Sequence, residues 1–197
     1  MKLFKENSYD IIRLYVNQIG ITIFSMALYT AVGAIQDTST RMTIKIIMSV
    51  FATLFYLSLI YNCVWEYGAK DRIRVDGGKA EKYDYKGLFM GLFANFPNFI
   101  LSGLSIIYVS VVLLGGAEVF ESLFALTYMI LRFHTAMYLG IIQGVTPNEI
   151  TDVPNYPDCL VESILFFVLP FLSVGVSHLA YTLGYKEIKI FSKSNKK

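Results

Sequence analysis

Four long blocks without a charged residue constrain this chain more than any other feature. They cover residues 14–36, 46–65, 87–117 and 163–185. A helix needs about 20 apolar residues to cross a hydrocarbon core about 30 Å thick, because it rises about 1.5 Å per residue. Unpaired backbone amides are costly in that core, so the blocks are predicted to be helices rather than open strands. We expect spans near residues 14–36, 46–65, 88–114 and 160–184.

Composition supports the same class of protein. Hydrophobic residues make up 55% of the 197 residues and charged residues 16%, against about 25% charge in an ordinary soluble domain. These values argue against a disordered chain, a disulfide scaffold and a soluble enzyme domain. The sequence therefore predicts an all-α integral membrane protein, with residues 1–197 forming a single membrane domain.

The apolar segment 122–144 differs from the four blocks because Arg132 and His134 interrupt it. Only ten uncharged residues precede Arg132, and so short a stretch is more typical of a re-entrant or interfacial helix than of a span. We therefore expect four transmembrane helices plus one re-entrant or interfacial hydrophobic helix. Five transmembrane helices are the alternative.

The placement of Lys and Arg favours four spans. With both termini on the cytoplasmic side of a cell membrane, that side holds 14 of the 17 basic residues, and only Arg41, Lys45 and Arg132 lie elsewhere. A fifth span would move the basic C-terminal tail to the outside. On the four-span plan, residues 65–87 form a cytoplasmic loop and residues 115–158 an outer hairpin.

Arg132 and His134 are the first candidate functional residues, because an ionisable group at membrane depth is costly and commonly functional. On a continuous helix Thr127, His134 and Tyr138 would share one stripe and Arg132 would flank it. Such a stripe could line a polar pathway. In the alternative, Arg132 reaches the outer interface and pairs with a carboxylate. The candidates for that carboxylate are Glu118, Glu121 and Glu162.

Two prolines mark a second candidate site. Pro97 and Pro170 each remove a helix hydrogen bond near the middle of a predicted span, and Asn95 and Asn98 lie on one face beside Pro97. Broken helices that meet near the midplane are typical of a transport site. The alternative is that the two asparagines only form hydrogen bonds between helices.

The segment 65–87 is the third candidate. Its basic residues could bind anionic lipid headgroups or dock a partner, or they could only anchor the loop on the positive side. Asp76-Gly77-Gly78 predicts a turn, and the mixed charge suggests an ordered segment such as a hairpin. The lipid or partner residues are Lys70, Arg72, Arg74, Lys79 and Lys82.

These features favour a channel or transporter subunit, in a homo-oligomer or with other membrane subunits. A binding or scaffold subunit that docks a partner through the basic loop is the alternative. An outer-face enzyme using Cys159 and His134 comes third, because no catalytic motif supports it. We expect membrane lipids as partners, and we expect no nucleic acid, cofactor or metal.

Overall fold

A computed structural model describes residues 2–146 and 155–188 of the chain, with side chains from residue 7 onward. Within these ranges the chain is helical and contains no strand. The elements are α1 (Lys2–Gly33), α2 (Thr38–Asp76), α3 (Lys86–Ala94), α4 (Phe96–Leu113), α5 (Glu118–His134), the 3₁₀ turn η1 (Ala136–Tyr138), α6 (Leu139–Val145), α7 (Tyr156–Val168) and α8 (Pro170–Tyr185).

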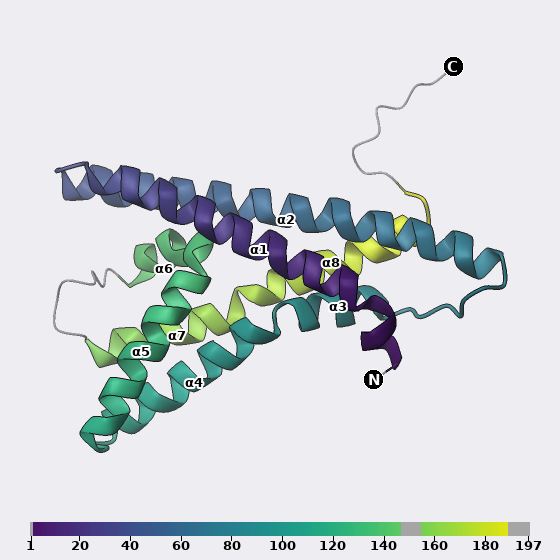
Figure 1. Cartoon of the computed structure of the whole chain (residues 1–197). Helices are drawn as coiled ribbons and strands as arrows, with labels where there is room; N and C mark the ends of the chain where they lie inside the picture. Colours follow the sequence, from purple (N-terminus) through teal and green to yellow (C-terminus); the bar gives the residue numbers. More distant parts are fainter. Residues whose placement is uncertain (1, 147–154, 189–197) are drawn as a thin grey trace.

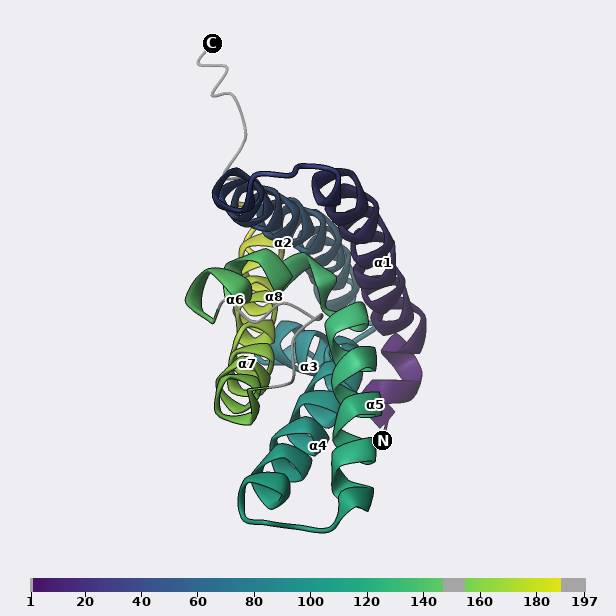
Figure 2. The ribbon, with the colours of Figure 1, turned by 90° about the vertical axis from the view of Figure 1, so that its left-hand side faces the viewer.

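The helices form an elongated bundle with two distinct ends (Figure 1). The start of α1, the α2–α3 connection and the end of α8 lie at one end, which we call the basic end. The α1–α2 and α4–α5 connections lie at the other, which we call the hairpin end. Viewed along the bundle, α1 and α2 form one side, while α4 and α5 extend away from them (Figure 2). The basic end therefore collects three segments that were predicted from the sequence to lie on one side of the membrane.

Four helical segments are long and apolar enough to cross a membrane: Asn7–Gly33, Thr38–Asp76, Phe96–Leu113 and Tyr156–Tyr185. A fifth segment pairs Glu118–His134 with Ala136–Val145 at a bend of 79°, which fits either a broken span or a re-entrant loop. The predicted fold class, an all-α membrane protein with four spans and one additional hydrophobic segment, is confirmed. The bend follows directly after Arg132 and His134, the two residues that set this segment apart from the other blocks.

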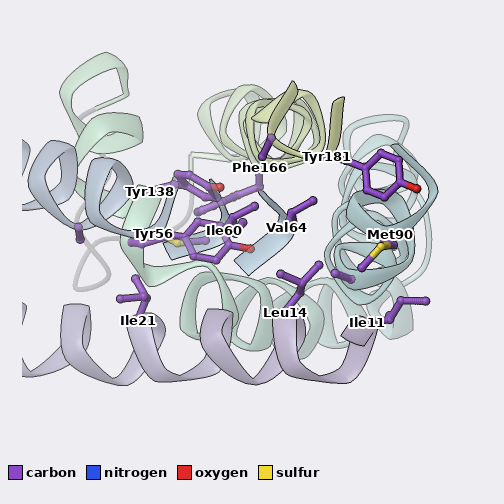
Figure 3. Close-up of a cluster of buried hydrophobic side chains, with 14 of the residues drawn as sticks. Ile11, Leu14, Ile21, Tyr56, Ile60, Val64, Met90, Tyr138, Phe166 and Tyr181 are labelled. Atoms are coloured by element: carbon purple, nitrogen blue, oxygen red, sulfur yellow. The ribbon is translucent and has the colours of Figure 1, made fainter. Parts of the chain in front are cut away.

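The buried apolar core runs along the middle of the bundle (Figure 3). Tyr56, Ile60 and Val64 line one face of α2 at helical spacing and are at most 2% exposed. Leu14 of α1 and Phe166 of α7 belong to the same cluster. The exposed apolar side chains lie on the outer surface of the bundle, where lipid chains replace a protein partner.

Glycines let α2 and α8 approach closely near the basic end. A Cβ on Gly184 would overlap the carbonyl of Trp65, and one on Gly68 would overlap the carbonyl of Tyr181. On α3, a Cβ on Gly87 would lie 2.7 Å from the Ser177 carbonyl oxygen of α8. Small residues thus serve close packing within the chain at these contacts.

The expectation of a hairpin in segment 65–87 is wrong, because α2 continues through Asp76. Glu66 and Lys70 form a 2.7 Å ion pair one turn apart, and Arg72 and Asp76 form a second at 3.5 Å. Such pairs favour a continuing helix. At about 1.5 Å per residue, the 39 residues of α2 extend about 58 Å, well beyond a hydrocarbon core of about 30 Å. The helix ends at the predicted turn, where Gly78 has a φ of 67°.

Candidate functional site

Two helix breaks meet inside the bundle. α3 ends at Ala94 and α4 begins at Phe96, with Pro97 in the first turn of α4. α7 ends at Val168 and α8 begins at Pro170. The side chain of Asn95 bridges the two breaks.

Asn95 makes this bridge with its amide. Its Nδ2 donates to Ser173 Oγ at 2.8 Å and to the Gly91 carbonyl at 2.9 Å. Ser173 Oγ in turn donates to the Pro170 carbonyl at 2.8 Å. The amide and the hydroxyl therefore link carbonyls next to both breaks, and the Gly91 carbonyl also accepts the backbone N–H of Asn95.

A continuous polar face extends from this bridge along α4. Asn95, Asn98, Ser102 and Ser105 follow one another at spacings of three, four and three residues, so they share one side of the helix. Asn98 Nδ2 donates to Asn95 Oδ1 at 3.1 Å. At the far end, Ser105 Oγ lies 2.8 Å from Ser163 Oγ of α7. Each of these side chains is at most 1% exposed. We call these five residues and Ser173 the polar row.

Several buried polar atoms in and beside the polar row lack a hydrogen-bond partner among the described residues. They are Asn98 Oδ1, Ser177 Oγ, Gln18 Nε2 and Tyr138 Oη. Tyr56 lies nearby in the core and donates to Gln18 Oε1 at 3.4 Å. A buried polar atom without a partner is costly, and natural proteins keep few of them. Such atoms are positions at which a polar solute or a water molecule would gain a hydrogen bond.

Glu162 forms a second polar cluster beside the polar row, next to Ser163 in sequence. Its side chain is fully buried. Tyr128 donates its hydroxyl proton to Glu162 Oε2, and Thr146 Oγ1 donates to Oε1 at 3.1 Å. The guanidinium of Arg132 lies 5.3 Å from the centre of the Tyr128 ring. Tyr128 thus contacts both the carboxylate and the cation, and Glu162 connects α5 and the end of α6 to α7.

The predicted stripe of Thr127, His134 and Tyr138 is wrong, because α5 ends at His134 and the chain then bends. The hydroxyl of Thr135 donates to the Leu131 carbonyl at 2.6 Å and closes the helix there. Thr127 is half-buried. The three side chains do not share one helix face.

His134 and Arg132 also have separate surroundings. The ring of His134 packs edge-on against Tyr15 of α1, with ring centres 5.6 Å apart. The His134 carbonyl accepts a hydrogen bond from Thr22 Oγ1 at 2.9 Å. His134 therefore contacts α1, whereas Arg132 contacts the Tyr128 side of α5.

Three of the five basic residues proposed to bind lipid or a partner form ion pairs within the chain. Lys70 pairs with Glu66, and Lys82 pairs with Asp84 at 2.6 Å. Arg72 contacts Asp76 on its own helix and lies 3.3 Å from Glu187 after α8. Arg74 and Lys79 are exposed and form no ion pair within the described ranges. Part of the charge in this segment thus forms ion pairs that stabilise the segment itself.

The two cysteines are free and lie on different helices. Cys159, near the start of α7, is 2% exposed and packs in a small cluster with Val109 and Phe124. Cys63 lies on α2 and accepts a 3.5 Å hydrogen bond from Asn17. No group of three His, Cys, Asp or Glu residues able to hold a metal occurs within residues 2–146 and 155–188.

Sequence reasoning identified Asn95, Asn98, Pro97, Pro170 and Glu162, but it missed their partners. Ser102 and Ser105 could have been found, since they continue the face of Asn95 and Asn98 at helical spacing. The contacts with Ser173, Ser163 and Tyr128 depend on how distant helices are aligned, which the sequence pattern does not encode. Residues 147–154, part of the predicted outer hairpin, lie outside the described ranges.

Comparison with protein-family models, with curated proteins and with solved structures finds no match to this chain. The function of the chain is therefore inferred from its residues and their geometry.

Proposed function

We propose that this protein is a channel or transporter subunit that moves a small polar solute along the polar row between α3–α4 and α7–α8. The observation that carries the proposal is the contact between the two helix breaks, in which Asn95 of one break hydrogen-bonds Ser173 of the other. Discontinuous helices that meet within the bundle are the usual construction of membrane transport sites, since the breaks expose backbone groups to a solute.

The chemistry of the polar row favours solutes that exchange hydrogen bonds. Its side chains are amides and hydroxyls, which both donate and accept and carry no charge. From Asn95 to Ser105 the row extends about 15 Å along α4, about half of the hydrocarbon core. A solute that moves along the row would lose hydrogen bonds to water and would form hydrogen bonds with one side chain after another in their place.

The polar row is closed in this conformation, because its side chains are at most 1% exposed. Transport therefore requires α3–α4 to move relative to α7–α8. The breaks at Asn95 and at Leu169 are the natural hinges, since the chain leaves one helix there and enters the next. The separate helices on either side of each break can then turn without unfolding.

We further propose that the basic end faces the cytoplasm. The start of α1, the α2–α3 connection and the end of α8 meet there (Figure 1). The wider regions 2–13, 70–86 and 186–197, which include these segments, hold 14 of the 17 Lys and Arg residues, and four of the 14 lie beyond residue 188, outside the described ranges. Cytoplasmic segments of membrane proteins carry such an excess. Both termini are then cytoplasmic and the α5–α6 segment enters from the outer side.

Flux in proteoliposomes tests the proposal. Vesicles with and without the protein receive osmotic pulses of glycerol, urea, alanine, NaCl or KCl, and light scattering follows the recovery of vesicle volume. We expect the protein to accelerate recovery for at least one solute, and Asn98→Leu to reduce that gain at least tenfold. Gly103→Leu is the matched control, because it adds the same side chain on α4 where nothing lies within 4 Å. Recovery no faster than in empty vesicles for every solute would contradict the proposal.

A further inference from the structure

A pocket of about 380 Å³ opens at the basic end, away from the polar row. It lies between the last residues of the α2–α3 connection and the last two turns of α8. Its lining includes Lys82, Tyr85, His178, Tyr181, Tyr185 and Lys186. Tyrosine is enriched where a membrane meets water, and the pocket stands where two helices of the bundle reach their ends. We therefore expect the pocket to lie at the depth of lipid headgroups.

The walls of the pocket are held in place by specific contacts. Tyr85 stacks on His178 with ring centres 6.1 Å apart and an angle of 14° between the rings. Tyr181 and Tyr185 stack at 6.4 Å. Tyr181 also donates to Asp71 of α2 at 2.9 Å, which fixes its ring against the bundle. The pocket is thus lined by side chains of α8 and of the α2–α3 connection, and Asp71 of α2 supports one of its walls.

The charge that faces the pocket is positive. Lys82 and Lys186 contribute two positive charges and Asp84 contributes one negative charge. Lys82 is held over the Tyr185 ring at 5.6 Å and pairs with Asp84 at 2.6 Å. The hydrogen bond with Asp84 raises the pKa of Lys82, so the ammonium stays charged at neutral pH. Lys186 is exposed and forms no ion pair within the described ranges, so its charge is available to a ligand.

A second polar side chain, that of His178, also lines the pocket. Nδ1 of His178 is buried and has no partner among the described residues. Three of the last four carbonyls of α8 are already occupied, since the backbone N–H groups of Lys186, Glu187 and Ile188 donate to them. The negative end of the α8 dipole is thereby partly compensated, and Lys186 adds a positive charge at that point. An anion would meet a lysine and an imidazole here.

We propose that this pocket binds the phosphate of a phospholipid headgroup, with Lys186 and His178 as its polar contacts and the tyrosines packed around the glycerol. The ligand class follows from a positive, tyrosine-lined pocket at headgroup depth, where phosphate is the common anion. Free phosphate shares this chemistry, and the experiment separates the two sources. The pocket shares no residue with the polar row, so the proposal of lipid binding can be tested independently of the proposal of transport.

Native mass spectrometry of the full chain, stripped of lipid in detergent, tests the site. Phosphatidylglycerol, phosphatidylcholine and inorganic phosphate are titrated separately. We expect one phosphatidylglycerol to bind, Lys186→Gln to weaken that binding at least fivefold, and His178→Phe to weaken it as well. Lys79→Gln is the matched control, because it removes an exposed lysine outside the pocket and should change binding less than twofold.

Three results would overturn the assignment. Equal phosphatidylglycerol binding by wild type and Lys186→Gln would show that Lys186 does not contact the lipid. Tighter binding of phosphatidylcholine, unaffected by Lys186→Gln, would show that the tyrosines recognise the ammonium group instead. Binding of inorganic phosphate with none of either lipid would assign the pocket to the free anion. Thermal melting of each variant shows whether it is folded, so a loss of binding through unfolding is recognised.

Discussion

An ionic contact at the basic end gives the sharpest stability prediction. Asp71 of α2 accepts hydrogen bonds from Lys86 Nζ at the start of α3, at 2.5 Å, and from the Tyr181 hydroxyl of α8, at 2.9 Å. The Lys86 and Asp71 side chains are only 13% and 11% exposed. Three helices are therefore joined at one carboxylate.

Lys86→Met keeps most of the aliphatic stem and removes the charge, which leaves Asp71 buried with one hydrogen bond. Removing one partner of a buried ion pair lowers the free energy of unfolding by about 3–5 kcal/mol. Because the Lys86 and Asp71 side chains keep some exposure to solvent, we expect a loss of about 3 kcal/mol here. In a chain of this size each kcal/mol changes Tm by about 2–4 °C, so we expect a fall of about 6–12 °C. Thermal unfolding in detergent, followed by circular dichroism, measures it.

The double variant Lys86→Met with Asp71→Asn separates the pair from general damage. Neutralising both partners removes the uncompensated charge, so the double variant should lose less than the sum of the two single variants, by about 1 kcal/mol or more. Lys79→Met is the control for removing an exposed lysine and should leave Tm within about 1 °C. Additive losses, or a Lys86→Met variant as stable as Lys79→Met, would refute the role of the ion pair.

Three further predictions concern packing, the buried carboxylate and a helix start. Gly184→Leu should lower Tm by several degrees because its Cβ would overlap the neighbouring α2 backbone, whereas Gly175→Leu, with nothing within 4 Å, should not; equal effects would contradict the close contact. Tyr128→Phe removes a hydrogen bond to the buried Glu162 carboxylate and should cost about 1.5–3 kcal/mol in thermal unfolding, a loss that an unchanged Tm would exclude. Hydrogen bonds at the start of α2 lower the pKa of Asp37, so its stabilising effect should be present above about pH 3.9 and lost as the pH falls through the lower folded-state pKa; an NMR titration midpoint at or above 3.9 would contradict this.

The spans could be predicted from the sequence because membrane thickness fixes the length of an uncharged helix. Charge was a weaker guide to helix ends. The charged residues after Trp65 led to the prediction of a loop, although Glu66 with Lys70 and Arg72 with Asp76 have the spacing of helix-stabilising pairs. A charged helix that leaves the membrane and a charged loop have the same composition.

The candidate site could be predicted only in part. Prolines and asparagines marked the breaks, since their backbone chemistry is local. The partner of Asn95, Ser173, follows from the alignment of α3 with α8 over 78 residues of chain. The contact of Thr146 with Glu162 lies beyond the 79° bend after His134, where nothing in the sequence forbids a continuing helix. Helix periodicity thus predicts faces, but not which faces meet.

Water access to the polar row tests the central claim most directly. In a background with Cys63→Ser and Cys159→Ser, single cysteines replace Ser105 and Ser173 in the row and Ile107, 56% exposed on the outer surface of α4. A thiol reacts with a methanethiosulfonate reagent as the thiolate, which forms in water and not in lipid. In proteoliposomes we predict modification of Ser105→Cys and Ser173→Cys but not of Ile107→Cys. If the two row cysteines stay unmodified while the variants remain folded, the row is only a packed interface between helices and the protein has no solute pathway there.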